Sequence, residues 1–182
     1  MEKLTLFDKT FVPYISSDTL QKAIDGVAAR INQDFKDCED IPILLCVLNG
    51  SIMFTAELMK RLKFNCQIVS IKLSSYEGTK TTGIVKAVMG LTASVKGRRV
   101  IVVEDIVDTG NTIVELRRLL KEQGAAETYV CTMLFKKEAF RFEDAPDYVA
   151  MQIENRFIVG FGLDYDEIGR NLPDIWILDP NS

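Results

Sequence analysis

Short apolar runs alternate along the chain with longer stretches in which apolar residues recur at helical spacing. Runs of about four to eight apolar residues are typical of buried strands, and helical spacing is typical of helices with one buried face. We therefore expect strands at residues 43–48, 67–73, 84–89, 100–103, 128–135, 147–151, 157–161 and 174–178. Helices are expected from Ser16 or Ser17 to about residue 35, from 51 to about 62, and from the turn at 109–112 to Gly124.

The two ends of the chain have weaker patterns. Residues 1–16 are rich in apolar side chains without a clear period, and we expect an irregular lead-in. Residues 147–151 and 157–161 are expected to form a pair of strands around a turn at 154–155. Residues 174–178, which hold the only tryptophan, Trp176, are expected to be an edge strand.

The alternation of strands and helices predicts an α/β fold. Such an order implies a mainly parallel, twisted sheet with helices on both faces and right-handed crossovers. The chain has 182 residues and no repeat, linker or low-complexity stretch, so residues 1–182 are expected to form a single domain.

Charge and cysteine content narrow the class of protein. A net charge of −4 and a pI near 5.0 predict no nucleic-acid and no membrane partner, because there is no basic surplus. The four cysteines have no C-x-x-C spacing, and no signal-peptide pattern is present, which favours reduced thiols in a cytoplasmic protein. The chain has no histidine, so a general base must be a carboxylate, lysine, tyrosine or cysteine.

Candidate chemistry gathers in residues 99–112, RVIVVEDIVDTGNT, where a strand leads through acids into a helix. Backbone N–H groups at such a helix N-terminus bind phosphate, Gly110 permits close approach, and Thr109 and Thr112 add hydroxyl donors. The neighbouring acids would repel a bare phosphate, but they suit a ribose diol or a Mg²⁺ ion that also holds phosphate oxygens. The loop is therefore expected to bind a sugar phosphate, although an ordinary strand end with a capped turn has the same pattern.

Residues 103–112, VEDIVDTGNT, resemble the phosphoribosyl-pyrophosphate signature of type I phosphoribosyltransferases, and their sequence is most similar to that of the hypoxanthine-guanine branch. The resemblance covers roughly residues 10–178. It implies the type I phosphoribosyltransferase fold, with a small hood lobe formed by the N-terminal lead-in and about 140–182, and a mobile lid hairpin. It further implies Mg²⁺ as cofactor and a homodimer or homotetramer.

The resemblance also assigns site residues. It implies that Asp108 is catalytic, acting on the purine N7 proton, and that ribose and 5′-phosphate are bound by Glu104, Asp105, Asp108, Thr109, Gly110, Asn111 and Thr112. The implied purine contacts are Lys136, Phe157, Ile158 and Asp164; the pyrophosphate contacts are Asn49, Gly50 and Arg170; and the metal ligands are Glu104, Asp105 and Asp164. Asn49 stands where the family often has lysine, which leaves the backbone role intact and removes a charged contact.

Several of these positions have an ordinary structural interpretation as well. The corner at 49–51 suits a second anion site or a simple strand–helix turn equally well. Residues 74–83 suit a solvated hairpin loop or a lid with glycine hinges, and the resemblance favours the lid, carrying Ser75 and Tyr76. Taken alone, Lys136 suits an exposed lysine, Phe157 a core ring and Asp164 a turn carboxylate.

The function implied is purine salvage by a glycosyltransferase. The enzyme would transfer the 5-phosphoribosyl group from phosphoribosyl pyrophosphate to a free purine base with a 6-oxo group, hypoxanthine and also guanine, giving IMP or GMP and pyrophosphate. Two alternatives stay open: a phosphoribosyltransferase for xanthine, adenine or a pyrimidine, and a non-enzymatic regulator of the same fold that binds nucleotide and RNA. Lys136 and Phe157 favour a 6-oxopurine, and the acidic pI disfavours the RNA regulator.

Overall fold

A six-stranded sheet forms the larger part of the protein in the computed structural model, which describes residues 3–75, 85–89, 91 and 93–180. The strand order is β5-β4-β3-β6-β7-β8. The parallel strands are β3 (Ile43–Leu48), β4 (Gln67–Ser75), β6 (Arg99–Val107), β7 (Glu127–Phe135) and β8 (Tyr148–Gln152), and β5 (Val85–Met89) pairs antiparallel with β4. The mainly parallel sheet expected from the sequence is confirmed.

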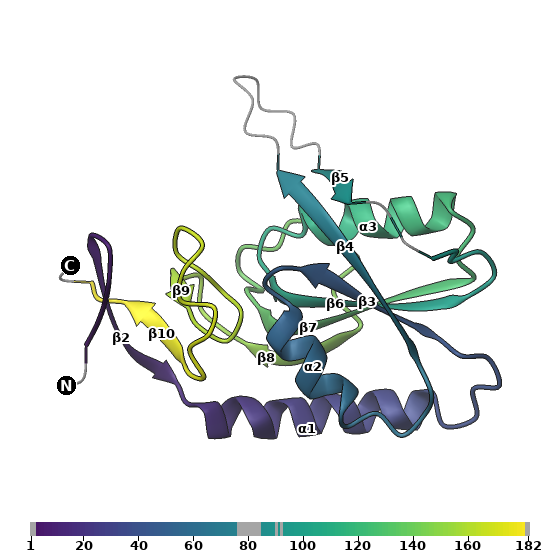
Figure 1. Ribbon diagram of the computed structural model, residues 1–182, viewed down its shortest axis with the longest axis horizontal. Coiled ribbons are helices and arrows are strands. Elements are labelled where there is room, and N and C mark those ends of the chain that lie inside the picture. The colour runs from purple at the N-terminus through teal and green to yellow at the C-terminus, as the bar shows by residue number, and fades with distance from the viewer. Residues whose placement is uncertain (1–2, 76–84, 90, 92, 181–182) are drawn as a thin grey trace.

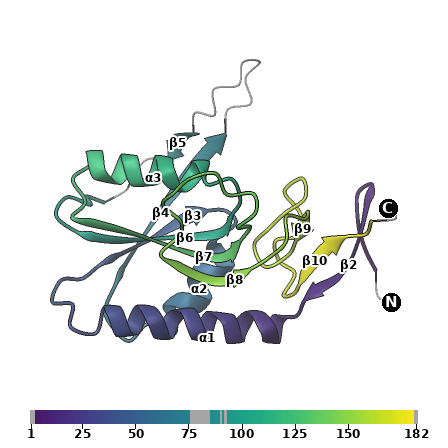
Figure 2. The ribbon, with the colours of Figure 1, turned by 180° about the vertical axis from the view of Figure 1, so that it is seen from behind.

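Helices cover both faces of this sheet, as Figures 1 and 2 show from opposite sides. Helices α1 (Ser17–Asp34) and α2 (Ile52–Met59) pack with one core cluster, and α3 (Asn111–Glu122) packs with the other. Ser16 starts α1 by accepting a 3.3 Å hydrogen bond from the Thr19 backbone N–H. Gly124 follows α3 with φ +79°, the left-handed conformation expected of the residue that ends a helix.

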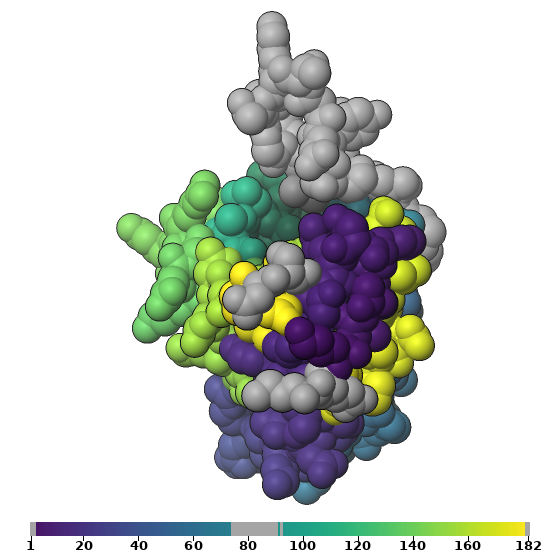
Figure 3. Space-filling view, turned by 90° about the vertical axis from the view of Figure 1, so that its left-hand side faces the viewer, coloured from purple at the N-terminus to yellow at the C-terminus, as the bar shows by residue number. Residues whose placement is uncertain are grey.

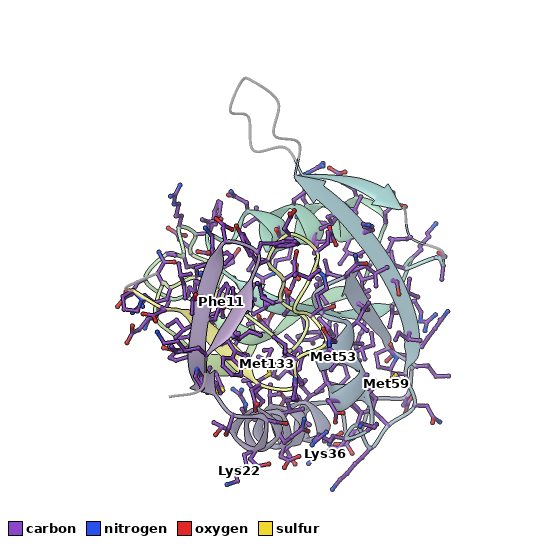
Figure 4. The ribbon with its side chains drawn as sticks, turned by 60° about the vertical axis from the view of Figure 1, so that its left-hand side comes forward. Phe11, Lys22, Lys36, Met53, Met59 and Met133 are labelled. Carbon is purple, nitrogen blue, oxygen red and sulfur yellow. The ribbon has the colours of Figure 1, made fainter. Side chains whose placement is uncertain are left out.

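A second, four-stranded sheet forms a small lobe that holds both ends of the described chain (Figure 3). Its order is β1-β2-β10-β9, with β1 (Leu4–Leu6), β2 (Lys9–Ile15), β9 (Ile158–Val159) and β10 (Ile175–Leu178). Phe11, Val159 and Trp176 are the buried members of its core. Figure 4 shows Phe11 on the N-terminal hairpin and Met133 in the larger part of the molecule.

The structure corrects three expectations about the strands near the two ends of the chain. The lead-in at 1–16 was expected to be irregular, but residues 4–6 and 9–15 form strands because β10 supplies the partner for β2. Residues 147–151 and 157–161 do not pair: β8 extends the large sheet beside β7, and β9 pairs with β10. The strand of Trp176 lies inside the small sheet, between β2 and β9, and is not an edge.

One lobe boundary changes with them. The C-terminal part of the small lobe was expected to begin at about residue 140, yet residues 148–152 belong to the large sheet.

Among the described residues, no helix is both long and apolar enough to cross a membrane. The four cysteines are free.

Candidate active site

A cavity of about 350 Å³ lies at the carboxyl ends of β3 and β6. Parallel sheets place ligands at this edge, because the loops that follow the strands converge there. The lining includes Val47, Leu48 and Leu73 from neighbouring strands and residues 104–110, 112 and 113 from the predicted phosphate segment. The structure therefore brings the sequence-predicted loop to the mouth of the sheet.

The phosphate loop follows a longer strand than expected. β6 continues to Val107, so Glu104 and Asp105 lie within the strand and not after it. Gly110 has φ +93° and immediately precedes α3, which begins at Asn111. The first N–H groups of a helix have no partner within it, so this turn offers them to an anion.

Of the two adjacent acids, Glu104 is buried and Asp105 is partly buried. Burial, and secondarily the charge of Asp105, raises the pKa of Glu104 well above its usual range. Burial raises the pKa of Asp105 to about 6, opposed by the hydrogen bond from the Ile106 backbone N–H and by Arg170. Both carboxyls are therefore poised to gain a partner that favours their charged form, such as a cation or a hydroxyl donor.

Gly50 places the loop after β3 directly against Asp105. A Cβ added at Gly50 would stand 1.7 Å from Asp105 Oδ2, so only glycine permits this approach. On the other side, a Cβ at Gly162 would stand 1.9 Å from the Gly50 carbonyl oxygen. The loop after β3, the end of β6 and the segment around residue 162 thus meet at Gly50, and the peptide bond before Asn49 is cis.

Arg170 connects this meeting point to Asp164. Its Nη2 lies 2.7 Å from Asp164 Oδ1, and its Nη1 donates a 2.8 Å hydrogen bond to the Gly162 carbonyl. The Arg170 Nε is buried and has no hydrogen-bond partner among the described residues. A buried donor without a partner is costly, so a bound anion would satisfy it.

The predicted purine residues come from two parts of the fold. Lys136 follows β7, is buried, and its Nζ lies 3.1 Å from Asp108 Oδ2. Phe157 and Ile158 belong to the small lobe, where Ile158 is buried in β9 and Phe157 is 43% exposed. Phe157 meets Tyr165 edge-on, with ring centroids 5.7 Å apart, so it is braced on one side and free on another.

The lid assignment remains a prediction. Ser75 is the last residue of β4, and Tyr76 and the rest of the expected lid, up to residue 83, lie outside the described residues. The strands that flank the segment, β4 and β5, pair antiparallel as expected of a hairpin.

Within the described part of the chain, no three His, Cys, Asp or Glu side chains gather as a ready-made metal site. Asp105 and Asp164 nevertheless act on one another electrostatically, and both interact with Arg170. Mg²⁺ usually takes one or two carboxylates and completes its shell with phosphate oxygens and water. The residues present fit a Mg²⁺ ion that arrives with a pyrophosphate group, and Asp105 and Asp164 would hold it. The role of Glu104 as a further metal ligand stays a prediction.

Two groups of residues in the site were missed by sequence reasoning. Gly162 makes the close approach to Gly50, and the rings of Phe140 and Phe142 pack against Gly110. For Gly162, the only signal in the sequence was a glycine between two apolar residues. Nothing in the spacing of residues 137–142 indicated that their aromatic rings would reach the phosphate loop.

Comparison with known proteins agrees with this geometry. Residues 16–166 match the family model described as the phosphoribosyl transferase domain. The chain is 39% identical over 165 residues to the hypoxanthine-guanine phosphoribosyltransferase of Streptococcus pneumoniae, covering 90% of this chain and 91% of that one. It is also 39% identical over 164 residues to the hypoxanthine-guanine-xanthine phosphoribosyltransferase of Tritrichomonas foetus, covering 90% and 88%.

A solved structure extends the likeness to three dimensions. The hypoxanthine-guanine phosphoribosyltransferase of Bacillus anthracis superposes with a TM-score of 0.86 at 36% identity, covering 92% of this chain and 98% of that one. The chain therefore belongs to the phosphoribosyltransferase family. Within that family, two of the relatives are named hypoxanthine-guanine phosphoribosyltransferase and the third hypoxanthine-guanine-xanthine phosphoribosyltransferase, which confirms the branch indicated by residues 103–112.

Proposed function

We propose that this protein transfers the 5-phosphoribosyl group from phosphoribosyl pyrophosphate to the 6-oxopurines hypoxanthine and guanine, forming IMP or GMP and pyrophosphate in purine salvage. The observation that carries the proposal is the cavity at the ends of β3 and β6, where a phosphate loop, buried acids and the Lys136–Asp108 pair come together. The names of the relatives support the same reaction.

The sugar phosphate is held from two directions. The 5′-phosphate binds the N-terminus of α3 at residues 108–112, and the ribose hydroxyls lie against Glu104 and Asp105. The pyrophosphate lies against the loop at Asn49–Gly50 and near Arg170, whose buried Nε it would satisfy. When bound, Mg²⁺ neutralises charge that develops on the leaving pyrophosphate.

The base binds between Lys136 and Phe157. Lys136 donates to the 6-oxo group, Phe157 stacks on the ring, and the backbone at Ile158 and the carboxylate of Asp164 read the remaining edge. Asp108 accepts the proton from N7 as the glycosidic bond forms. The Asp108 carboxylate, an acceptor, lies 3.1 Å from the Lys136 ammonium, a donor. This matches the base, whose N7 proton needs an acceptor and whose adjacent 6-oxo group needs a donor.

Water must be excluded during the transfer. Positive charge grows on the sugar in an oxocarbenium-like transition state, and water that reached it would give hydrolysis. We assign this exclusion to the lid at residues 74–83, with Ser75 and Tyr76. We also propose a homodimer or homotetramer in the cytoplasm.

The test is a panel assay. The protein is incubated with phosphoribosyl pyrophosphate, Mg²⁺ and each of hypoxanthine, guanine, xanthine, adenine and uracil, and nucleotide formation is followed. We expect IMP and GMP to form, with adenine and uracil rejected, and sizing by light scattering to give a dimer or tetramer. If only adenine or only uracil is converted to a nucleotide, the protein is a phosphoribosyltransferase for a different base. If it binds phosphoribosyl pyrophosphate or nucleotide but converts no base, it is a non-enzymatic regulator.

A further inference from the structure

The segment at residues 136–142, which we term the backing segment, contacts the phosphate loop along its length. The Lys136 backbone N–H donates a 2.9 Å hydrogen bond to the Val107 carbonyl, and the Arg141 N–H donates a 3.2 Å bond to the Thr109 carbonyl. At Gly110, an added Cβ would stand 2.4 Å from Phe140 Cε2 and 2.9 Å from Phe142 Cδ2. The backing segment therefore touches successive positions of the loop from one side.

These contacts determine which way the loop's N–H groups point. The N–H and C=O of a trans peptide point in opposite directions. Because the carbonyls of Val107 and Thr109 face the backing segment, the N–H groups of Asp108 and Gly110 face away from it. Asp108 and Gly110 both line the cavity, so N–H groups on the side of the loop away from the backing segment are available to an anion bound there.

Gly110 is the position in the loop that most needs external support. It adopts φ +93°, and glycine has more alternative backbone conformations than any other residue. The ring of Phe140 fills the space where a side chain would be, and it is itself held by Phe135, with ring centroids 5.3 Å apart. The Phe140 ring leaves room only for glycine at position 110, and it also restricts the backbone conformations that Gly110 can adopt.

We propose that Phe140 is a positioning residue that holds Gly110 in the conformation that binds the 5′-phosphate. The inference rests on the proposed function of the loop at 108–112. Phe140 is not among the residues that line the cavity, so we expect it to act through Gly110. Its ring limits the loop to one arrangement before binding, so less conformational freedom is lost when the phosphate arrives.

Loss of the Phe140 ring should affect only the binding of the phosphate group. Lys136 is held by its own hydrogen bond to Val107, in continuation of the β6–β7 pairing, and does not depend on the Phe140 ring. Loss of the ring should therefore weaken binding of the sugar phosphate and leave recognition of the base unchanged.

The experiment compares Phe140→Ala with the parent by calorimetric binding of ribose 5-phosphate and by steady-state kinetics. We expect the Kd for ribose 5-phosphate and the KM for phosphoribosyl pyrophosphate to rise about tenfold or more, with the hypoxanthine KM within about twofold. Phe140→Tyr retains the ring edge and should restore binding. Phe64→Ala removes a half-buried ring that stacks on Phe35, away from the cavity, and should change neither constant.

Each other outcome has a definite meaning. If Phe140→Ala does not fold, Phe140→Leu retains bulk but lacks the Cε2 carbon, and it should show the same selective loss. Unchanged ribose 5-phosphate binding in a folded variant, or an equal rise in both KM values, overturns the positioning role alone. A parent that binds no ribose 5-phosphate overturns the phosphate loop and the positioning role together.

Discussion

Asp108 and Lys136 form an ion pair at the edge of the cavity, and each has a different chemical task in the proposed reaction. Asp108→Asn removes the proton acceptor while leaving the loop backbone in place. We expect kcat to fall by about 10²–10⁴-fold, the usual loss for a general base, with ribose 5-phosphate binding retained. Glu138→Gln changes an exposed acid nearby and is the control. A kcat within a few fold of the parent would contradict the assignment.

Lys136 should determine base choice. An ammonium group only donates, so it satisfies a 6-oxo group and opposes the 6-amino group of adenine. Lys136→Ala would leave the 6-oxo group of hypoxanthine as a buried acceptor without a donor, which costs about 1–3 kcal/mol. It should therefore raise the hypoxanthine KM about tenfold to a hundredfold and leave the KM for phosphoribosyl pyrophosphate nearly unchanged. The neighbouring Lys137 is exposed, and Lys137→Ala should change neither value. Efficient use of adenine by the parent would disprove this reasoning.

Asp105 should make stability depend on pH. Its pKa is raised by burial from an ordinary value of 3.8 to about 6, so the folded state binds a proton more tightly than the unfolded state. The free energy of unfolding should therefore fall as pH rises from about 4 to about 6, by up to about 3 kcal/mol, and this contribution should then level off.

Asp105→Asn retains the acceptor for the Ile106 N–H and removes the charge. We expect the variant to show a flatter decline over that pH window and a higher melting temperature at pH 7 than the parent, measured by thermal unfolding without ligands. Glu154→Gln, at an exposed position, should follow the parent curve. An identical pH profile for Asp105→Asn and the parent would show that Asp105 titrates normally.

At the scale of elements, the site depends on how closely the loop after β3 approaches β6. Gly50→Ala would place a methyl group 1.7 Å from Asp105 Oδ2, so the loop or the carboxylate must move. We expect a loss of about 1–3 kcal/mol in stability, typical of overpacking, and a marked loss of activity in the panel assay.

Gly26 offers a matched control on α1, because a Cβ there meets nothing within 4 Å. Gly26→Ala should be neutral, or stabilising by up to about 1 kcal/mol, since alanine suits a helix better than glycine does. Full activity in Gly50→Ala would mean that the contact with Asp105 has no functional role.

At the scale of the whole molecule, the small lobe joins the two ends of the described chain around the ring proposed to stack on the base. Phe11 is fully buried and lies 6.1 Å from Phe157 between ring centroids. Phe11→Ala should cost about 3–5 kcal/mol in the free energy of unfolding, and it should raise the hypoxanthine KM more than that for phosphoribosyl pyrophosphate.

Phe7→Ala provides the comparison within the same hairpin. Phe7 is 60% exposed, so its loss should change stability by well under about 1 kcal/mol. Chemical denaturation and paired KM measurements distinguish the two variants. An equal rise in both KM values for Phe11→Ala would indicate general loosening and no specific support of the base site.

The sequence by itself determined the phosphate loop and the large sheet, except for the place of β8 in it. Their patterns are local: a buried parallel strand is a continuous apolar run, and the acids, glycine and threonines of the loop all lie within residues 104–112. Gly124 ended α3 as expected for the same reason, because a helix terminus depends on the few residues around it.

Only the tertiary structure decided how the strands of the small lobe pair and what supports the site. The strands at residues 9–15 and 175–178 are stabilised by each other, and no local pattern identifies a partner so far along the chain. Likewise, Gly50 meets Asp105 and Gly162, and Phe140 meets Gly110, because strand order places their loops at one edge of the sheet. Chemistry carried by consecutive residues can be predicted from sequence, whereas contacts between distant segments exist only after the chain has folded.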